Sequence, residues 1–282
     1  MITQLVVQKR SPAYYDEGIV DREITFSMTE SEYLIRHIDG LGPVKADFSM
    51  APRAIDSGSI NVGNHINIRN IVITLGFDPT VSTVETLRQN LYPVFVVGEE
   101  VELIFTSGNL GVLGIKGVEQ SNTPSIFSAE PLNQISILCP DPYFYDYVGL
   151  RTINVPVTSS LTTNRFDYDY VGDVPVGIIV DSALIGSTSY FEVNNYPTGL
   201  YGSARITRAF VSGNAARLNT IKGQRAAQYA TSGVYYNAIG LLSGSLVKLH
   251  MKPGTNYFSF RVGTANALST TTIKYYRRYG GL

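Results

Sequence analysis

Large apolar residues recur at every second position along much of this chain. Three such sets lie within residues 24–28, 71–77 and 258–262. Because successive side chains of a β-strand point to opposite faces, each set predicts a strand with one buried face. Two continuous apolar runs, 101–105 and 135–138, predict more fully buried strands. Turn-forming sequences separate the strands, among them Asp39-Gly40, Ser57-Gly58, Ser107-Gly108-Asn109 and Pro253-Gly254. The chain is predicted to be mainly β.

One segment has helical spacing instead. Its apolar positions are Val84, Leu87, Leu91 and Val94. Ser82 and Glu85 are three residues apart, which is the spacing of a capping box, and Thr83 is an alternative N-cap. The apolar face of such a helix leaves Arg88 and Gln89 on the outside. The pattern therefore predicts one amphipathic helix in this region.

Two further features bear on the helical content. Pro93 is expected to end or distort the first helix, because proline lacks the backbone N–H that a helix interior needs. A second short helix is predicted for residues 214–221, where Ala215, Ala216 and Leu218 are compatible with helical packing. The architecture is thus expected to be β-rich with one or two short helices.

A change of composition predicts a domain boundary in the middle of the chain. Four prolines, at positions 140, 142, 156 and 175, surround a polar stretch and an acidic, aromatic stretch. Such sequences are typical of connections between domains. We predict a first domain over residues 1–147, connecting strands over 148–176 and a second domain over 177–282.

The charges follow this division. Charged residues make up only 16% of the chain, against about 25% in an ordinary soluble domain, and a surface so poor in charge is often covered by partners. The formal net charge of −1 hides two opposite halves. Residues 1–147 hold 9 Lys and Arg against 18 Asp and Glu, and the remainder holds 13 against 5. Near-neutrality alone argues against strong binding to nucleic acid or anionic membranes, but the asymmetry predicts an assembly subunit whose two ends face different neighbours.

The sequence also indicates in which cellular compartment the protein is made. Cys139 is the only cysteine, so no disulfide can form within the chain. Residues 1–10 lack the apolar core of about 7–15 residues that a signal peptide needs. No stretch of about 18 apolar residues is present, so we expect no membrane insertion. These features predict a protein that is made in a cytoplasm and is not exported by the usual route.

No catalytic or metal-binding motif is found. His37, His65 and His250 are far apart in sequence and match no zinc spacing. Glycine-rich phosphate loops and the G-x-S-x-G elbow are also missing from the sequence. Cys139 precedes Pro140 at the end of an apolar run, with neither a histidine nor a helix start beside it, which favours a small core residue over a catalytic thiol.

Two acidic clusters leave alternatives open. Asp167, Asp169 and Asp173 lack the glycine and the closing glutamate of an EF-hand loop, so a solvated acidic loop is favoured over an irregular calcium site. Glu100 and Glu102 would share one face of a strand, and a catalytic pair there is disfavoured because such pairs are common by chance. We therefore predict that the chain is not an enzyme and holds no cofactor or metal.

In the segment 135–144, two prolines end a buried strand and aromatic residues follow. This segment resembles the strand and turn that close the N-terminal domain of siphophage distal tail proteins. The matching positions, in chain order, are Gly40, Pro43, Arg69, Leu87, Arg88, Cys139, Pro140, Asp141, Pro142, Tyr143, Phe144, Pro253, Gly254 and Asn256. The closing segment 273–281 resembles the last strand of the family. The resemblance spans most of the chain.

The resemblance implies a fold and a role. The fold would be a mainly β, two-domain one, with an N-terminal, β-rich, ring-forming domain that contains one helix, and a C-terminal galectin-like β-sandwich. The subunit would form a hexameric ring at the phage tail tip, in the virion, after assembly in the host cytoplasm. The ring would join the tail tube protein to the tail hub, let DNA pass, and dock receptor-binding or baseplate proteins.

Two alternative functions and one consequence accompany this interpretation. The 19 Tyr and 12 Phe are compatible with a glycan-binding adhesion module, which the lack of Trp disfavours, and a tail-associated hydrolase is a third hypothesis. If the acidic half forms the ring, an acidic lumen would keep DNA phosphates from binding during passage. The opposite possibility is that these carboxylates meet basic neighbours or the other half of the chain.

Overall fold

The structure is a computed structural model that describes residues 2–10, 20–27, 32–53, 55–125, 130–196 and 201–282. The chain forms two compact units. Unit 1 comprises Met1–Val148 together with Tyr279–Leu282, and unit 2 comprises Gly149–Arg278. All 18 acidic and 9 basic residues of the first sequence half fall in unit 1, and the 5 acidic and 13 basic residues of the second half fall in unit 2. The charge asymmetry is therefore a difference between two compact bodies.

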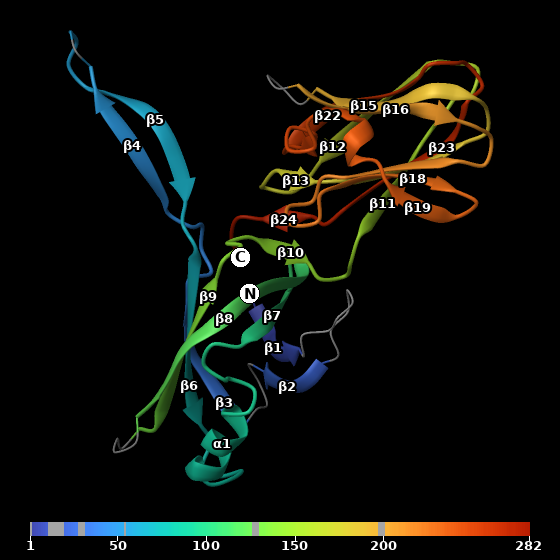
Figure 1. Cartoon of the computed structure of the whole chain (residues 1–282). Helices are drawn as coiled ribbons and strands as arrows, with labels where there is room; N and C mark the ends of the chain where they lie inside the picture. Colours follow the sequence, from blue (N-terminus) through green and yellow to red (C-terminus); the bar gives the residue numbers. More distant parts are fainter. Residues whose placement is uncertain (1, 11–19, 28–31, 54, 126–129, 197–200) are drawn as a thin grey trace. The chain divides into compact units, whose positions relative to one another are not determined.

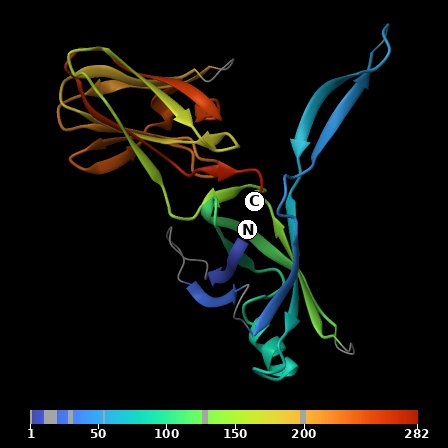
Figure 2. The ribbon, with the colours of Figure 1, turned by 180° about the vertical axis from the view of Figure 1, so that it is seen from behind.

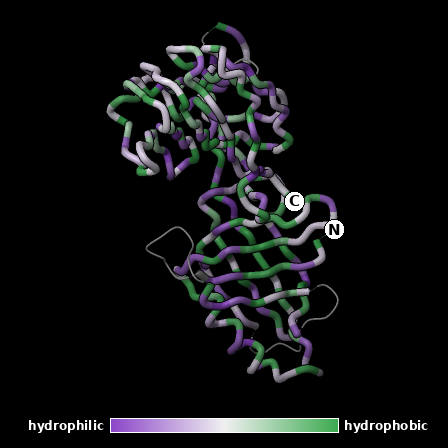
Figure 3. Tube along the Cα trace, turned by 90° about the vertical axis from the view of Figure 1, so that its right-hand side faces the viewer, coloured by the Kyte–Doolittle hydropathy of each residue, from purple (hydrophilic) through white to green (hydrophobic). Residues whose placement is uncertain are grey.

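Unit 1 is built on a nine-stranded sheet whose main path runs β2-β1-β7-β8-β9-β6-β3 (Figure 1). Neighbours along this path are antiparallel. The strands are β1 Ile2–Arg10, β2 Val20–Ser27, β3 Tyr33–Asp39, β6 Arg69–Phe77, β7 Glu100–Ser107, β8 Gly111–Pro124 and β9 Leu132–Cys139. Two short strands complete it, β10 Phe144–Asp146 and β24 Arg278–Tyr279. Figure 3 shows hydrophobic and hydrophilic residues alternating along parts of the sheet, and β6 has the alternation that the sequence predicts.

Helix α1 Val84–Leu91 covers part of the core of unit 1. Thr83 is the N-cap, and its hydroxyl accepts a hydrogen bond from the Thr86 N–H. Leu87 and Leu91 are fully buried, and the Tyr33 hydroxyl donates to the Leu87 carbonyl over 3.0 Å. The helix stops at Leu91, two residues before Pro93, as predicted. A single α-helix is present in the described part of the chain.

The outward position predicted for Arg88 is wrong. This side chain is only 8% exposed, and its Nη2 donates to the Ser125 carbonyl over 2.6 Å. The guanidinium also lies 5.6 Å from the centre of the Phe77 ring. A long cationic side chain can turn its head toward a carbonyl and an aromatic face on the buried side of a helix, which helical spacing alone does not reveal.

A separate two-stranded hairpin, β4 Ala46–Pro52 and β5 Ser59–Ile66, belongs to unit 1. Figures 1 and 2 show it as a long ribbon that extends from the end of β3 and the start of β6. Its two strands pair with each other only. This segment is the least covered part of unit 1 in the described chain.

Unit 2 consists of two antiparallel sheets that share one hydrophobic core. The six-stranded sheet has the order β11 Arg151–Val155, β23 Leu268–Tyr275, β14 Ile179–Leu184, β17 Ala215–Asn219, β18 Ala226–Thr231 and β19 Val234–Asn237. The five-stranded sheet has the order β12 Thr163–Tyr170, β22 Gly254–Val262, β15 Thr188–Asn195, β16 Gly202–Phe210 and β20 Leu242–Gly244. A short pair, β13 Val176–Gly177 and β21 His250–Met251, and a 3-10 turn, η1 Ile239–Leu241, complete the unit. Its architecture is a β-sandwich.

The structure differs from the sequence prediction in one place here. The helix predicted over residues 214–221 is wrong, because the segment forms β17 between β14 and β18. Ala216 and Leu218 are buried at alternate positions, which is strand periodicity, and a short apolar segment of this length fits either pattern. Residues 148–176, predicted as connecting strands, include β11 and β12, which are edge strands of the two sheets of unit 2.

Candidate functional site

Arg69 is a buried charged residue of unit 1. It is the first residue of β6, pairs in register with Cys139 on β9, and is only 2% exposed. Its guanidinium lies over the Phe144 ring, 4.6 Å from the ring centre. Burial lowers the pKa of Arg69 from its ordinary value. A buried cation of this kind must have its donors satisfied, or the fold would lose several kcal/mol.

Backbone carbonyls from three separate segments satisfy it. Nε donates to the Pro142 carbonyl over 2.7 Å, and Nη2 donates to the Gly280 carbonyl over 2.7 Å. Nη1 donates to the carbonyls of Gly40 and Gly42, the latter over 2.7 Å. We call this arrangement the Arg69 clasp. It holds the turn after β3, the turn after β9 and the C-terminal segment against the start of β6.

The local sequence explains why these backbones come so close. Gly40 has φ +85°, and a Cβ at this position would lie 2.0 Å from the Asn70 carbonyl oxygen. A Cβ on Gly281 would lie 3.1 Å from the Leu41 carbonyl oxygen, and the Leu282 N–H donates to that same oxygen over 3.0 Å. Glycine is needed where backbones approach at this distance. The closing segment therefore lies directly on the turn after β3.

The clasp brings together several of the motif positions named from the sequence. Gly40, Arg69, Pro142 and Phe144 take part in it directly. The neighbouring motif positions Pro43, Pro140, Asp141 and Tyr143 lie next to these residues in the same two turns, and Cys139 is the last residue of β9. Cys139 is fully buried, and burial raises the pKa of its thiol to about 12, which suits a core residue.

The remaining motif positions lie elsewhere. Leu87 and Arg88 are on α1, within the core of unit 1. Pro253, Gly254 and Asn256 form a turn in unit 2, where Gly254 has φ +89°. The fully buried Asn256 closes this turn, because its Nδ2 donates to the carbonyls of Lys252 and Gly254 and its Oδ1 accepts from the Lys252 N–H. These two groups stabilise local structure in the two units.

Sequence reasoning missed the exposed apolar surface of the β4–β5 hairpin. Phe48, Met50 and Val62 are 57%, 59% and 69% exposed, and every described side chain of β5 is exposed. Ile60 and Ile66 add to this surface at 53% and 44%. The signal was present in the sequence, since apolar residues alternate on both sides of Ser57-Gly58, which is a hairpin pattern.

A buried carboxyl group distinguishes the sheet of unit 1. Glu119 on β8 is 1% exposed, and neither of its carboxyl oxygens has a hydrogen-bond partner within the described part of the chain. Burial raises the pKa of Glu119 to about 7. The protonated form is favoured because an ionised carboxylate would lose its hydration without compensation.

Unit 1 is therefore expected to lose stability as pH rises. The folded-state pKa of Glu119 lies above the ordinary value of 4.5, so the native state binds the proton more tightly than the unfolded chain. The free energy of unfolding is expected to fall by roughly 2 kcal/mol between pH 4.5 and 7 and to level off above that. Urea denaturation across this range measures the slope. The Glu119→Gln variant should show a smaller dependence of the free energy of unfolding on pH. The control variant Glu100→Gln, at an exposed position of β7, should keep the dependence of the original protein. An unchanged dependence in Glu119→Gln would contradict the raised pKa of Glu119.

Two further properties of the described residues concern metals and membranes. Within the described ranges, no group of three or more His, Cys, Asp or Glu side chains is placed to hold a metal ion. None of the helices in those ranges is long and apolar enough to span a bilayer.

Known proteins resemble this chain in fold but not in sequence. No protein-family model and no curated protein sequence matches the chain. This chain is similar to the crystal structure of the SPP1 Dit protein, with a TM-score of 0.64 and 12% sequence identity. The similarity covers 88% of this chain and 93% of the Dit chain. The Dit protein is described as a paradigm of the hub adsorption apparatus of phages that infect Gram-positive bacteria. This chain has the fold of the SPP1 Dit protein. A chain of the phage P2 baseplate in its activated, calcium-containing conformation is similar with a TM-score of 0.50 and 9% identity, over the full length of both. The mainly β fold class and the resemblance to distal tail proteins are thereby confirmed at the level of the fold.

Proposed function

We propose that this protein is a structural subunit of a phage tail tip, where six copies form a ring between the tail tube protein and the tail hub or baseplate. The observation that carries the proposal is the similarity to SPP1 Dit, which extends over nearly the whole of both chains rather than over one domain. The ring lets DNA pass through its lumen and offers a docking platform for receptor-binding or baseplate proteins. The role is structural, with no reaction catalysed.

The β4–β5 hairpin supports assembly into a ring. An isolated two-stranded hairpin is at best marginally stable in water, and large exposed apolar patches mark interaction surfaces. The hairpin carries Phe48, Met50 and Val62 well exposed. In a ring of identical copies each subunit uses two different surfaces, so a projecting hairpin on one subunit can pack on the body of the next. We propose that this hairpin is the main contact between neighbouring subunits.

The charge asymmetry supports different partners for the two units. Unit 1 has 9 basic and 18 acidic residues, and in a ring its carboxylates lining the lumen would repel DNA phosphates. Screening confines this effect to about 8 Å at physiological salt, so only residues at the lumen wall contribute. Unit 2 has 13 basic and 5 acidic residues, which favours acidic docking partners.

Substitution within the hairpin tests the proposed contact. Phe48→Asp combined with Val62→Asp places two charges on the apolar surface and is expected to shift the protein from hexamer to monomer, because an unpaired charge is costly in a desolvated interface. Sedimentation velocity at micromolar concentration measures the shift. Val171→Asp in unit 2 is a matched control, because Val171 is 66% exposed and Val62 is 69% exposed. A double variant that assembles as well as the control would refute the hairpin contact.

A further inference from the structure

The outer face of the five-stranded sheet in unit 2 carries polar residues in register across neighbouring strands. On β12 and β22, Thr163 pairs with Arg261, Arg165 pairs with Ser259, and Asp167 pairs with Tyr257. On the next strand, β15, Glu192 is opposite Arg261 and Asn194 is opposite Ser259. Because side chains two apart on a strand share a face, these residues lie on one polar face of the sheet.

A hydrogen-bond network fixes the middle of this surface. Glu192 is only 4% exposed, and its carboxylate accepts from Asn194 Nδ2 over 2.9 Å and from Arg205 Nε over 2.6 Å. Asn194 is fully buried; its Nδ2 also donates to the Ser259 hydroxyl, and its Oδ1 accepts from the Tyr201 hydroxyl over 2.8 Å. Burial alone would raise the pKa of Glu192, but the hydrogen bonds from Asn194 and Arg205 and the nearby arginines outweigh it and lower that pKa. The carboxylate is thus ionised, and it lies 3.7 Å from Arg261 Nη1.

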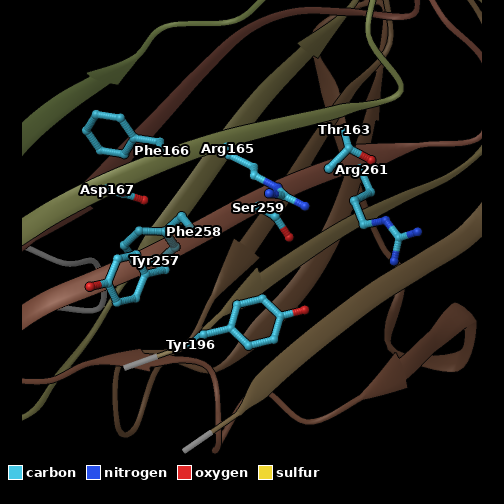
Figure 4. Close-up of a pocket in the computed structure, with 9 residues that line it drawn as sticks. All are labelled: Thr163, Arg165, Phe166, Asp167, Tyr196, Tyr257, Phe258, Ser259 and Arg261. Carbon is cyan, nitrogen blue, oxygen red and sulfur yellow. The ribbon is translucent and has the colours of Figure 1, made fainter. Parts of the chain in front are cut away.

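Beside this network the surface is hollowed. A hollow of about 990 Å³ opens over β12 and β22 and is lined in part by Arg165, Arg261, Ser259, Tyr196 and Tyr257 (Figure 4). Tyr196 and Tyr257 are 45% and 48% exposed, so both rings are accessible to a ligand. The volume lies in the range typical of small-molecule sites, about 300–1,000 Å³.

The chemistry of the hollow indicates the class of ligand. Within the described part of the chain, the Arg165 side chain makes no hydrogen bond or ion pair, and it points into the hollow in Figure 4. Its guanidinium is available for a carboxylate or phosphate, which arginine binds in bidentate geometry. The hydroxyls of Ser259 and Thr163 suit sugar hydroxyls, and the accessible tyrosine rings offer flat apolar faces for a sugar ring.

We propose that this hollow in unit 2 binds an anionic saccharide, a sugar that carries a carboxylate or a phosphate group. Arg165 binds the anionic group, Arg261 is held beside it by Glu192, and Tyr196 and Tyr257 flank the sugar ring. The excess of basic residues in unit 2 attracts such a ligand from a distance. The site is separate from the ring-forming role proposed above, and neither depends on the other.

Binding to the full-length protein, followed by isothermal titration calorimetry, tests the proposal. The probes are glucuronic acid, glucose 6-phosphate, glucose, inorganic phosphate and an oligoglutamate peptide. We expect at least one of the two anionic sugars to bind saturably at millimolar concentration, and at least tenfold more tightly than glucose and than inorganic phosphate. Arg165→Gln should weaken this binding by roughly tenfold, the size expected for loss of one charge-assisted contact.

A matched control variant and three possible outcomes decide whether the hollow binds an anionic saccharide. Arg225→Gln removes the same charge from an exposed position of unit 2 outside the hollow, and it should change the affinity less than twofold. The two anionic sugars distinguish a carboxylate ligand from a phosphate ligand. The proposal is overturned if neither anionic sugar binds, if only oligoglutamate binds, or if Arg165→Gln binds as tightly as Arg225→Gln.

Discussion

Replacing Arg69 by methionine is expected to lower the free energy of unfolding of unit 1 by about 3–5 kcal/mol. Methionine fills a similar volume but donates no hydrogen bond. Four carbonyl oxygens, those of Gly40, Gly42, Pro142 and Gly280, would lose their donor together, and the Phe144 ring would lose the cation above it. Urea denaturation followed by near-ultraviolet circular dichroism measures the loss.

An exposed arginine of the same unit provides the control. Arg22 on β2 is exposed, so Arg22→Met should change the free energy of unfolding by less than about 0.5 kcal/mol. Arg69→Lys should recover only part of the loss, because a single ammonium group cannot reach carbonyls that a planar guanidinium spans. If Arg69→Met were as stable as Arg22→Met, the clasp would not be a main support of unit 1.

Gly40→Ala is the second substitution expected to have a large effect, a loss of about 3–4 kcal/mol. Two costs combine at this position. The φ of +85° is unfavourable for any residue with a side chain, and the new Cβ would lie 2.0 Å from the Asn70 carbonyl oxygen. The backbone of the turn must move to relieve the clash, and the movement would carry the Gly40 carbonyl away from Arg69. Denaturation under the same conditions measures the effect.

The substitution Gly111→Ala separates the cost of the positive φ from the cost of the steric clash. The Gly111 φ of +79° is close to that of Gly40, but nothing lies within 4 Å of the Cβ that alanine would add. Gly111→Ala should therefore lose only the conformational part, about 1–2 kcal/mol. Equal losses at Gly40 and Gly111 would mean that the close approach to Asn70 relaxes without cost and that the turn does not need to be held in place.

Much of the strand framework could be predicted from residue pattern. The alternation over residues 71–77 corresponds to β6, and the run 135–138 lies within β9, its neighbour in the sheet. The helix near residue 84 was predictable because a cap, an apolar face and a proline all agree. Residues 214–221 failed because Ala215, Ala216 and Leu218 fit a helix or a strand equally well, and only pairing with β14 and β18 decides between them.

The clasp could not be predicted from the sequence, although its pieces could be recognised one by one. Arg69 is 29 residues from Gly40, 73 from Pro142 and 211 from Gly280. No local pattern shows that a cation will bind carbonyls at such separations, because backbone carbonyls leave no trace in the side-chain sequence. The inward position of Arg88 escaped prediction for the same reason, since its partner is the Ser125 carbonyl.

The path of the chain gives the clasp a further role. The chain leaves unit 1 after Val148 and returns to it at Tyr279, so unit 2 is inserted between two segments of unit 1. Gly280 is the position at which Arg69 holds the returning segment, and Tyr279 is buried in the core of unit 1. Unit 2 is thus connected to unit 1 by two chain segments, and the Arg69 clasp holds the second of them on unit 1.

The mass of the purified protein under native conditions tests the central claim most directly. The chain has a mass of 30.9 kDa, and native mass spectrometry combined with electron microscopy at micromolar concentration should show particles of six times that mass with sixfold symmetry and an open centre. A hexameric ring would support the proposed tail-tip role and would allow the lining of the lumen to be examined for carboxylates. A protein that remains monomeric throughout the micromolar range, with no ring in any image, would contradict the account.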